Sequence, residues 1–96
     1  MKHNVYFDGK VQSMGLNTEN GYATVGVISA GNYSFSTETE ERMIIISGAL
    51  DVKLPDEEWK LIKAGQEFKI KEKASFEVEA ASDVSYICYY GTPLIT

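Results

Sequence analysis

Glycines at short intervals divide the chain into brief segments, and this spacing constrains the possible folds more than any other sequence feature. Eight glycines are spread over the 96 residues, and the segments between them are rich in Val, Ile, Tyr, Phe and Thr. Such residues suit extended strands. Apolar and polar residues alternate most clearly in 50–54, 68–71 and 76–79. Roughly seven to nine short strands at turn spacings of about 8–12 residues indicate an all-β sandwich or small barrel with little or no helix.

The N-terminal residues predict a hairpin. Residues 5–7 read as a strand, Asp8-Gly9 as the turn, and residues 10–13 as the returning strand. His3 precedes the hairpin in a terminus that we expect to fray, where a functional role is not expected.

Residues 55–65 are ambiguous between a helix and a strand. Acidic residues come early in this segment, Lys63 comes late, and Gly65 stands at its end, as in a short capped helix. Local chemistry leaves a two-turn helix and a strand about equally compatible with the segment. The resemblance described below favours the strand.

Size and charge narrow the class of protein. A chain of 96 residues makes one domain, 1–96, with a single core. The net charge is −5, and eight of the nine cationic residues are scattered lysines, so the basic stripe of a nucleic-acid binder is missing. The longest strictly apolar run is residues 43–46, whereas a membrane span needs about 20 residues, so no membrane partner is expected.

The single cysteine, Cys88, cannot form an internal disulfide, and residues 1–6 contain no apolar signal core. We therefore expect a cytoplasmic protein. Cys88 has no basic neighbour in sequence to lower its pKa, so we expect a buried, inert thiol.

An ordered set of short motifs resembles the small, single-domain pyrimidine/purine nucleoside phosphorylases of bacteria. The set spans nearly the whole chain: Tyr6-Phe7-Asp8-Gly9-Lys10-Val11, Ala23-Thr24-Val25-Gly26-Val27, Gly31-Asn32-Tyr33-Ser34-Phe35-Ser36-Thr37, Glu41, Ser47-Gly48-Ala49-Leu50, Leu54-Pro55, Trp59, Ala64-Gly65, Phe68 and Tyr86-Ile87-Cys88-Tyr89-Tyr90. The resemblance implies a cupin fold, a jelly-roll barrel that usually assembles as a homodimer. It also implies a pentosyltransferase that uses orthophosphate to convert purine and pyrimidine nucleosides to free base and ribose 1-phosphate.

The cupin metal motif has lost its histidines. Metal-binding cupins resemble Gly-x5-His-x-His-x3,4-Glu-x6-Gly, and here Thr37 and Thr39 stand in the two histidine positions after Gly31. Glu41 and Gly48 keep the Glu-x6-Gly spacing, while the second block, which carries Pro-Gly-His in many relatives, reads Lys71-Glu72-Lys73. A metal needs three or four converging ligands, so we expect no metal and no other cofactor.

Glu41 is the candidate catalytic residue. Breaking an N-glycosidic bond passes through an oxocarbenium-like sugar, which a carboxylate can stabilise, by analogy with glycoside hydrolysis. Strand alternation would aim Glu41 inward with Met43 and Ile45. The alternative is a solvated loop charge beside Glu38 and Glu40.

The candidate substrate-binding residues fall into two groups. Lys10 lies in a family motif, and Ser36 and Thr37 carry hydroxyl donors for an anion; the alternatives are a surface charge and ordinary strand-end polarity. Arg42 is expected to form an exterior salt bridge instead. A site can accept many different nucleobases if it holds them by stacking on aromatic side chains. The aromatic candidates are Tyr6, Phe35, Tyr86 and Tyr90, and for each of them the favoured alternative is packing in the core.

A second function stays open at the level of sequence. The chain could be a non-catalytic small cupin that binds a nucleoside or another small polar ligand, because cupins host many functions. The altered segment 71–73 gives this alternative some weight. Base release that depends on phosphate would separate the enzyme from the binding module.

Overall fold

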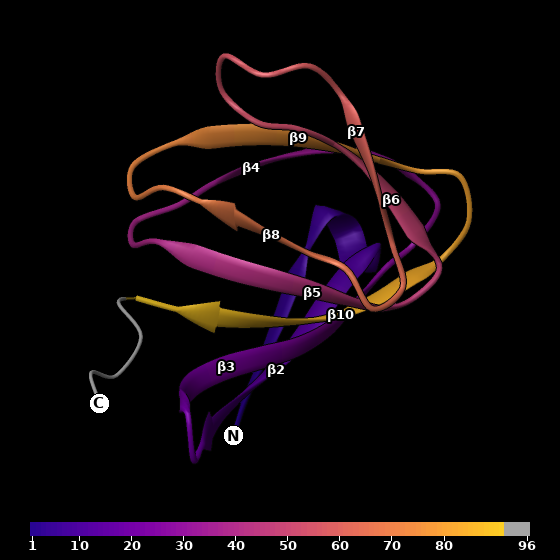
Figure 1. The fold of residues 1–96 in the computed structure, drawn as a ribbon. Coiled ribbons are helices and arrows are strands. Elements are labelled where there is room, and N and C mark those ends of the chain that lie inside the picture. Colours follow the sequence, from indigo (N-terminus) through magenta and orange to yellow (C-terminus); the bar gives the residue numbers. More distant parts are fainter. Residues whose placement is uncertain (92–96) are drawn as a thin grey trace.

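The chain forms two antiparallel β-sheets packed face to face (Figure 1). The computed structural model describes residues 1–91. The six-stranded sheet has the order β1-β2-β3-β10-β5-β8, and the four-stranded sheet has the order β4-β9-β6-β7. The strands are β1 Lys2–Tyr6, β2 Val11–Thr18, β3 Gly21–Ile28, β4 Gly31–Ser36, β5 Glu41–Ser47, β6 Ala49–Lys53, β7 Lys60–Lys63, β8 Glu67–Ile70, β9 Ser75–Ala80 and β10 Val84–Tyr90. Among residues 1–91, no helix has the length and apolarity needed to cross a bilayer.

Strand alternation places the core between the sheets. In β9, Phe76, Val78 and Ala80 are buried while the residues between them are exposed. The inward side chains of both sheets form one cluster, whose largest fully buried members include Ile28, Ile45, Leu50 and Ile70. The predicted all-β sandwich or barrel is confirmed.

Residues 60–63 form a strand, so the ambiguity over 55–65 is resolved against the helix. β7 pairs with β6 at the sheet edge, with Ile62 opposite Leu50 and buried against the core. Lys60, Leu61 and Lys63 point to solvent. The helix-favouring residues at the two ends of this segment are therefore outweighed by burial of the Ile62 side chain and by backbone hydrogen bonds to β6.

The N-terminal hairpin is confirmed, but the expectation of a frayed terminus is wrong. β1 begins at Lys2 and pairs with β2 in a register that runs from Lys2 opposite Gly15 to Tyr6 opposite Val11. His3 lies within this ladder, and its Nε2 is 3.0 Å from Oε1 of Gln12. Backbone pairing along the length of β1 orders this segment, although none of its side chains is buried.

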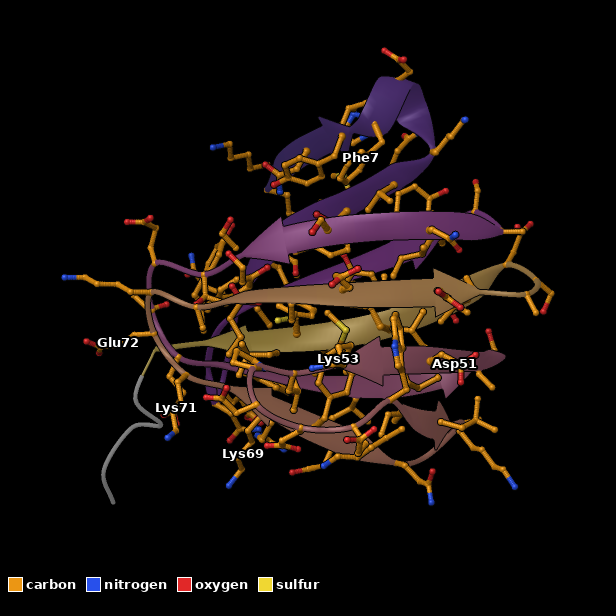
Figure 2. All side chains as sticks on the ribbon, turned by 90° about the horizontal axis from the view of Figure 1, so that it is seen from above. Phe7, Asp51, Lys53, Lys69, Lys71 and Glu72 are labelled. Atoms are coloured by element: carbon orange, nitrogen blue, oxygen red, sulfur yellow. The ribbon has the colours of Figure 1, made fainter. Side chains whose placement is uncertain are left out.

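The turn after β1, residues 7–9, packs against the four-stranded sheet. Phe7, Asp8 and Gly9 all have positive φ values, of 52°, 56° and 88°. A bulky residue rarely adopts such a φ, so packing must stabilise it. The Phe7 ring, labelled in Figure 2, belongs to this turn. It lies 5.0 Å from the ring of Tyr33 and 5.6 Å from that of Phe35, both on β4 of the other sheet.

Candidate functional site

A cavity of about 180 Å³ lies inside the barrel between the two sheets. Six of the eight predicted site residues line it: Tyr6, Phe35, Ser36, Glu41, Tyr86 and Tyr90. The other lining residues are Val11, Ser13, Ile28, Met43 and Phe76. The cavity is therefore walled mainly by aromatic and aliphatic side chains, with one carboxylate and a few hydroxyls, as in many small-molecule sites.

Two neighbouring strands bring the polar groups of this inner cavity together. In β10, Tyr86, Cys88 and Tyr90 point inward, and in β5 Glu41 shares the inward face with Met43. The register sets Tyr90 opposite Glu41. Glu41 is thus partly buried at the start of β5, and it is not a freely solvated loop charge.

A glycine makes room for Tyr86. The phenol ring lies over Gly26 of β3, where an added Cβ would come within 2.6 Å of the ring and 2.8 Å of the Gln12 carbonyl oxygen. The φ of Gly26 is not one that requires glycine. What glycine contributes here is the absence of a side chain, which leaves space for the Tyr86 ring. Sequence reasoning missed Gly26 and also Ser13; alternation from Val11 along β2 was the signal that could have found Ser13.

Glu41 and Cys88 interact inside the barrel. The Cys88 thiol donates to Oε1 of Glu41 across 3.5 Å. Burial raises the pKa of Glu41 above its usual value of 4.5, and the hydrogen bond from Cys88 offsets part of that rise. Neither of the ion pairs within residues 1–91 includes Glu41. The protein thus keeps a carboxyl group in a place where its charge is costly.

The hydroxyl and thiol groups around Glu41 stay protonated at neutral pH. Burial raises the pKa of Tyr86, Tyr90 and Cys88 well above their usual values. The Tyr90 hydroxyl is 2.8 Å from Oγ1 of Thr24, which fixes the ring. Cys88 is fully buried, as predicted, and the inertness of its thiol stays a prediction.

Two predicted site residues lie outside this cavity. The hydroxyl of Thr37 donates to the carbonyl oxygen of Lys71 at 2.6 Å and accepts from the N–H of Ala74 at 3.0 Å, so it fastens the turn between β8 and β9. Lys10 is exposed at the start of the hairpin's second strand and is not among the residues that line the cavity. A role of either residue in binding substrate stays a prediction.

A second cavity, of about 230 Å³, opens at the end of the barrel. Its lining residues are Asn20, Gly21, Tyr22, Glu40, Glu41, Arg42, Lys69, Tyr89, Tyr90 and Gly91. Arg42 donates from Nη1 to Oε1 of Glu67 at 3.1 Å, and its guanidinium carbon lies 4.8 Å from the centre of the Tyr89 ring. The expected exterior salt bridge of Arg42 is confirmed.

Within residues 1–91, no three His, Cys, Asp or Glu side chains converge closely enough to hold a metal ion. The Thr37 side chain, in the first histidine position of the cupin motif, is committed to backbone hydrogen bonds. The residues present therefore do not fit the metal site of a metal-binding cupin.

Comparison with known proteins identifies the family. The family model described as pyrimidine/purine nucleoside phosphorylase matches residues 1–90. The chain belongs to this family. It is 46% identical over 92 residues to the pyrimidine/purine nucleoside phosphorylase of Hahella chejuensis, covering 95% of the chain and 99% of that relative. It is 44% identical over 90 residues to that of Pseudomonas fluorescens, covering 93% of the chain and 96% of the relative.

Solved structures share the fold of this chain. A protein of unknown function from Vibrio parahaemolyticus superposes with a TM-score of 0.87 at 38% identity, covering 91% of this chain and 94% of that one. An RmlC-like cupin from Shewanella frigidimarina gives a TM-score of 0.72 at 14% identity, covering 91% and 79% of the two chains. The second likeness shows the fold alone and confirms the predicted cupin architecture.

Proposed function

We propose that this protein is a nucleoside phosphorylase that converts purine and pyrimidine nucleosides and orthophosphate to free base and ribose 1-phosphate. Family membership supports the reaction class. The observation that carries the proposal is the position of Glu41, a carboxyl group held inside an aromatic-lined cavity at a cost in solvation.

The reaction needs a group that stabilises positive charge on the sugar. As the bond from C1′ to the base nitrogen breaks, the base leaves with the electron pair and takes up a proton, and a phosphate oxygen forms the new bond to C1′. The Glu41 carboxylate faces the space where the ribose would lie and stabilises the oxocarbenium-like sugar or holds its hydroxyls. Its low-dielectric surroundings strengthen that effect.

The aromatic walls suit a site that accepts many bases. Phe35 and Phe76 stack with ring centres 5.6 Å apart, and Tyr6 and Tyr86 face the same cavity. Every nucleobase offers a π-face, so stacking binds purines and pyrimidines without reading their hydrogen-bonding edges.

The deciding experiment is base release from uridine and from inosine, each with and without orthophosphate. Release that depends on phosphate supports the proposal. Binding of either nucleoside with no turnover in phosphate would overturn it in favour of a non-catalytic cupin that binds nucleosides.

We also propose that the protein is a homodimer that forms through the outer face of the six-stranded sheet, next to the N-terminal strand. A row of apolar residues crosses four adjacent strands on this face: Met14, Val25, Ile87 and Ile44. Val25 and Val27 are 41% and 53% exposed. The outer face of an antiparallel sheet is normally polar, and an apolar patch of this kind is typical of an interface.

We place this enzyme in the cytoplasm, acting on free nucleosides and not on nucleic acid or at a membrane. Its net charge is −5 and its lysines are scattered, which disfavours polyanionic and lipid surfaces. Its one cysteine is buried and is not needed for a disulfide, which suits a reducing compartment.

A further inference from the structure

The inner and outer cavities share a wall. Glu41 and Tyr90 line both of them, so the start of β5 and the end of β10 form the boundary between the two spaces. The volumes are about 180 Å³ and 230 Å³, each below the roughly 300–1,000 Å³ of ordinary ligand pockets. Two adjacent cavities offer room for two substrates that react with each other.

The two spaces differ in chemistry. The inner cavity is walled by Phe35, Phe76 and tyrosine rings, which suit a base. Of its lining residues, Glu41 is the only Asp, Glu, Lys, Arg or His. The outer cavity contains two cationic side chains, Arg42 and Lys69, on facing positions of β5 and β8. A guanidinium and an ammonium group are the usual protein ligands of a phosphate.

We propose that the outer cavity is the orthophosphate subsite, that Lys69 and Arg42 bind the anion there, and that the nucleoside occupies the inner cavity. This inference rests on the proposed function and assigns its two substrates to the two sides of the Glu41–Tyr90 boundary. The phosphate then approaches the sugar at Glu41 from the end of the barrel, while the base lies among the aromatic side chains.

Both cations have donors to spare. The ion pair with Glu67 uses Nη1 of Arg42, and a guanidinium carries five N–H donors in all. The ion pairs within residues 1–91 join Arg42 to Glu67 and Lys60 to Glu57, so none of them engages Lys69. Figure 2 shows Lys69 toward the same end of the barrel as Lys71 and Glu72, and away from Asp51 at the opposite end.

Two acidic residues, Glu40 and Glu41, line this cavity and oppose an anion there. Glu40 lines the outer cavity and is exposed, and its carboxylate repels phosphate. Phosphate affinity therefore depends on the balance between the two cations, Lys69 and Arg42, and the two carboxyl groups of Glu40 and Glu41. Single substitutions at Lys69 and Glu40 should move this affinity in opposite directions.

The test is the KM for orthophosphate at saturating nucleoside, measured for Lys69→Gln, Glu40→Gln and Lys63→Gln. Lys69→Gln should raise this KM on the order of tenfold, because the variant loses one charge-assisted hydrogen bond to the anion. The KM for uridine should stay nearly unchanged. Glu40→Gln should lower it several-fold. Lys63 is exposed on β7, away from both cavities, so Lys63→Gln controls for the loss of one positive charge and should behave as wild type.

A KM for orthophosphate that is the same in Lys69→Gln and Lys63→Gln would overturn the assignment while leaving the phosphorylase activity standing. Absence of phosphate-dependent base release in the wild type would instead remove the proposed function. In that case calorimetric titration of inorganic phosphate into wild type and Lys69→Gln still decides the subsite: weaker binding to the variant supports it, and equal or undetectable binding to both overturns it.

Discussion

The thiol of Cys88 donates a hydrogen bond to the carboxyl group of Glu41 inside the barrel, although the two residues are 47 positions apart in the chain. Cys88 is fully buried and Glu41 lines both cavities. The protein thus supplies a weak donor to a carboxyl group whose charge is disfavoured by burial. Burial removes this carboxyl group from water, and neither ion pair within residues 1–91 includes Glu41 to compensate for that loss. A carboxyl group in such surroundings is typical of a functional site.

Replacing Glu41 with Gln should abolish most of the turnover without unfolding the protein. The amide keeps the shape and removes the charge, and positioned electrostatic groups of this kind contribute about 2.7–4 kcal/mol, or on the order of 10²–10³ in rate. Steady-state phosphorolysis of uridine is the measurement. Glu38→Gln, an exposed loop position that lines neither cavity, is the matched control. Equal activity of the two variants would remove Glu41 from the catalytic site.

The same substitution should stabilise the fold at neutral pH. Because the pKa of Glu41 is higher in the folded protein than its usual 4.5, the folded state binds more protons than the unfolded state between the two values. The free energy of unfolding therefore falls as pH rises through that window, and the loss persists above it. Thermal unfolding of wild type and Glu41→Gln at pH 4 and pH 8 tests this. The variant's advantage should be larger at pH 8; an advantage independent of pH would contradict the assignment.

Turnover should also depend on the ionisation of Glu41. If the carboxylate is the active form, kcat/KM rises with pH as Glu41 loses its proton. Since burial raises its pKa, the midpoint of that rise should lie above 4.5. A pH–rate profile of uridine phosphorolysis, compared with that of Glu38→Gln, provides the check. A midpoint at or below the ordinary glutamate value would show that another group controls the rate.

Alanine at position 26 should damage both the fold and the site. Its Cβ would meet the Tyr86 ring on one side and the fixed backbone oxygen of Gln12 on the other. Overpacking of this kind costs about 1–3 kcal/mol, so the melting temperature should fall. Displacement of Tyr86 should also raise the KM for nucleoside. Ser34→Ala, at an exposed position of β4, is the control and should change neither quantity; a Gly26→Ala variant as stable as Ser34→Ala would contradict the packing argument.

A charge placed at Val25 should dissociate the proposed dimer. Val25 lies between Met14 and Ile87 in the apolar row on the outer face of the six-stranded sheet. In a dimer with two-fold symmetry the substitution places one glutamate from each protomer in the interface. Burial of two unpaired carboxylates disfavours association. Light scattering at micromolar concentration should find a dimer for wild type and a monomer for Val25→Glu. Ser34→Glu, on the other sheet, should remain dimeric, and a monomeric wild type would refute the dimer itself.

Much of this protein is determined by local sequence pattern. The period-two alternation of β6, β8 and β9 sets which side chains face inward, because successive residues of a strand point to opposite faces. The same rule puts Glu41 on one strand face with Met43 and Ile45, and Tyr86 on one face with Tyr90. The loss of both metal-motif histidines at Thr37 and Thr39 is likewise visible in the sequence alone.

Tertiary structure decided what local pattern left open. The register of β10 against β5 brings Tyr90 and Cys88 to Glu41, and the pairing of β1 with β2 orders a terminus for which local pattern predicts fraying. The side-chain hydroxyl of Thr37 is taken up by the turn at Lys71 and Ala74. Such contacts join residues far apart in the chain, so they depend on which strands become neighbours. Local propensity carries no information on that choice, which is made by burial of the two sheet faces against each other.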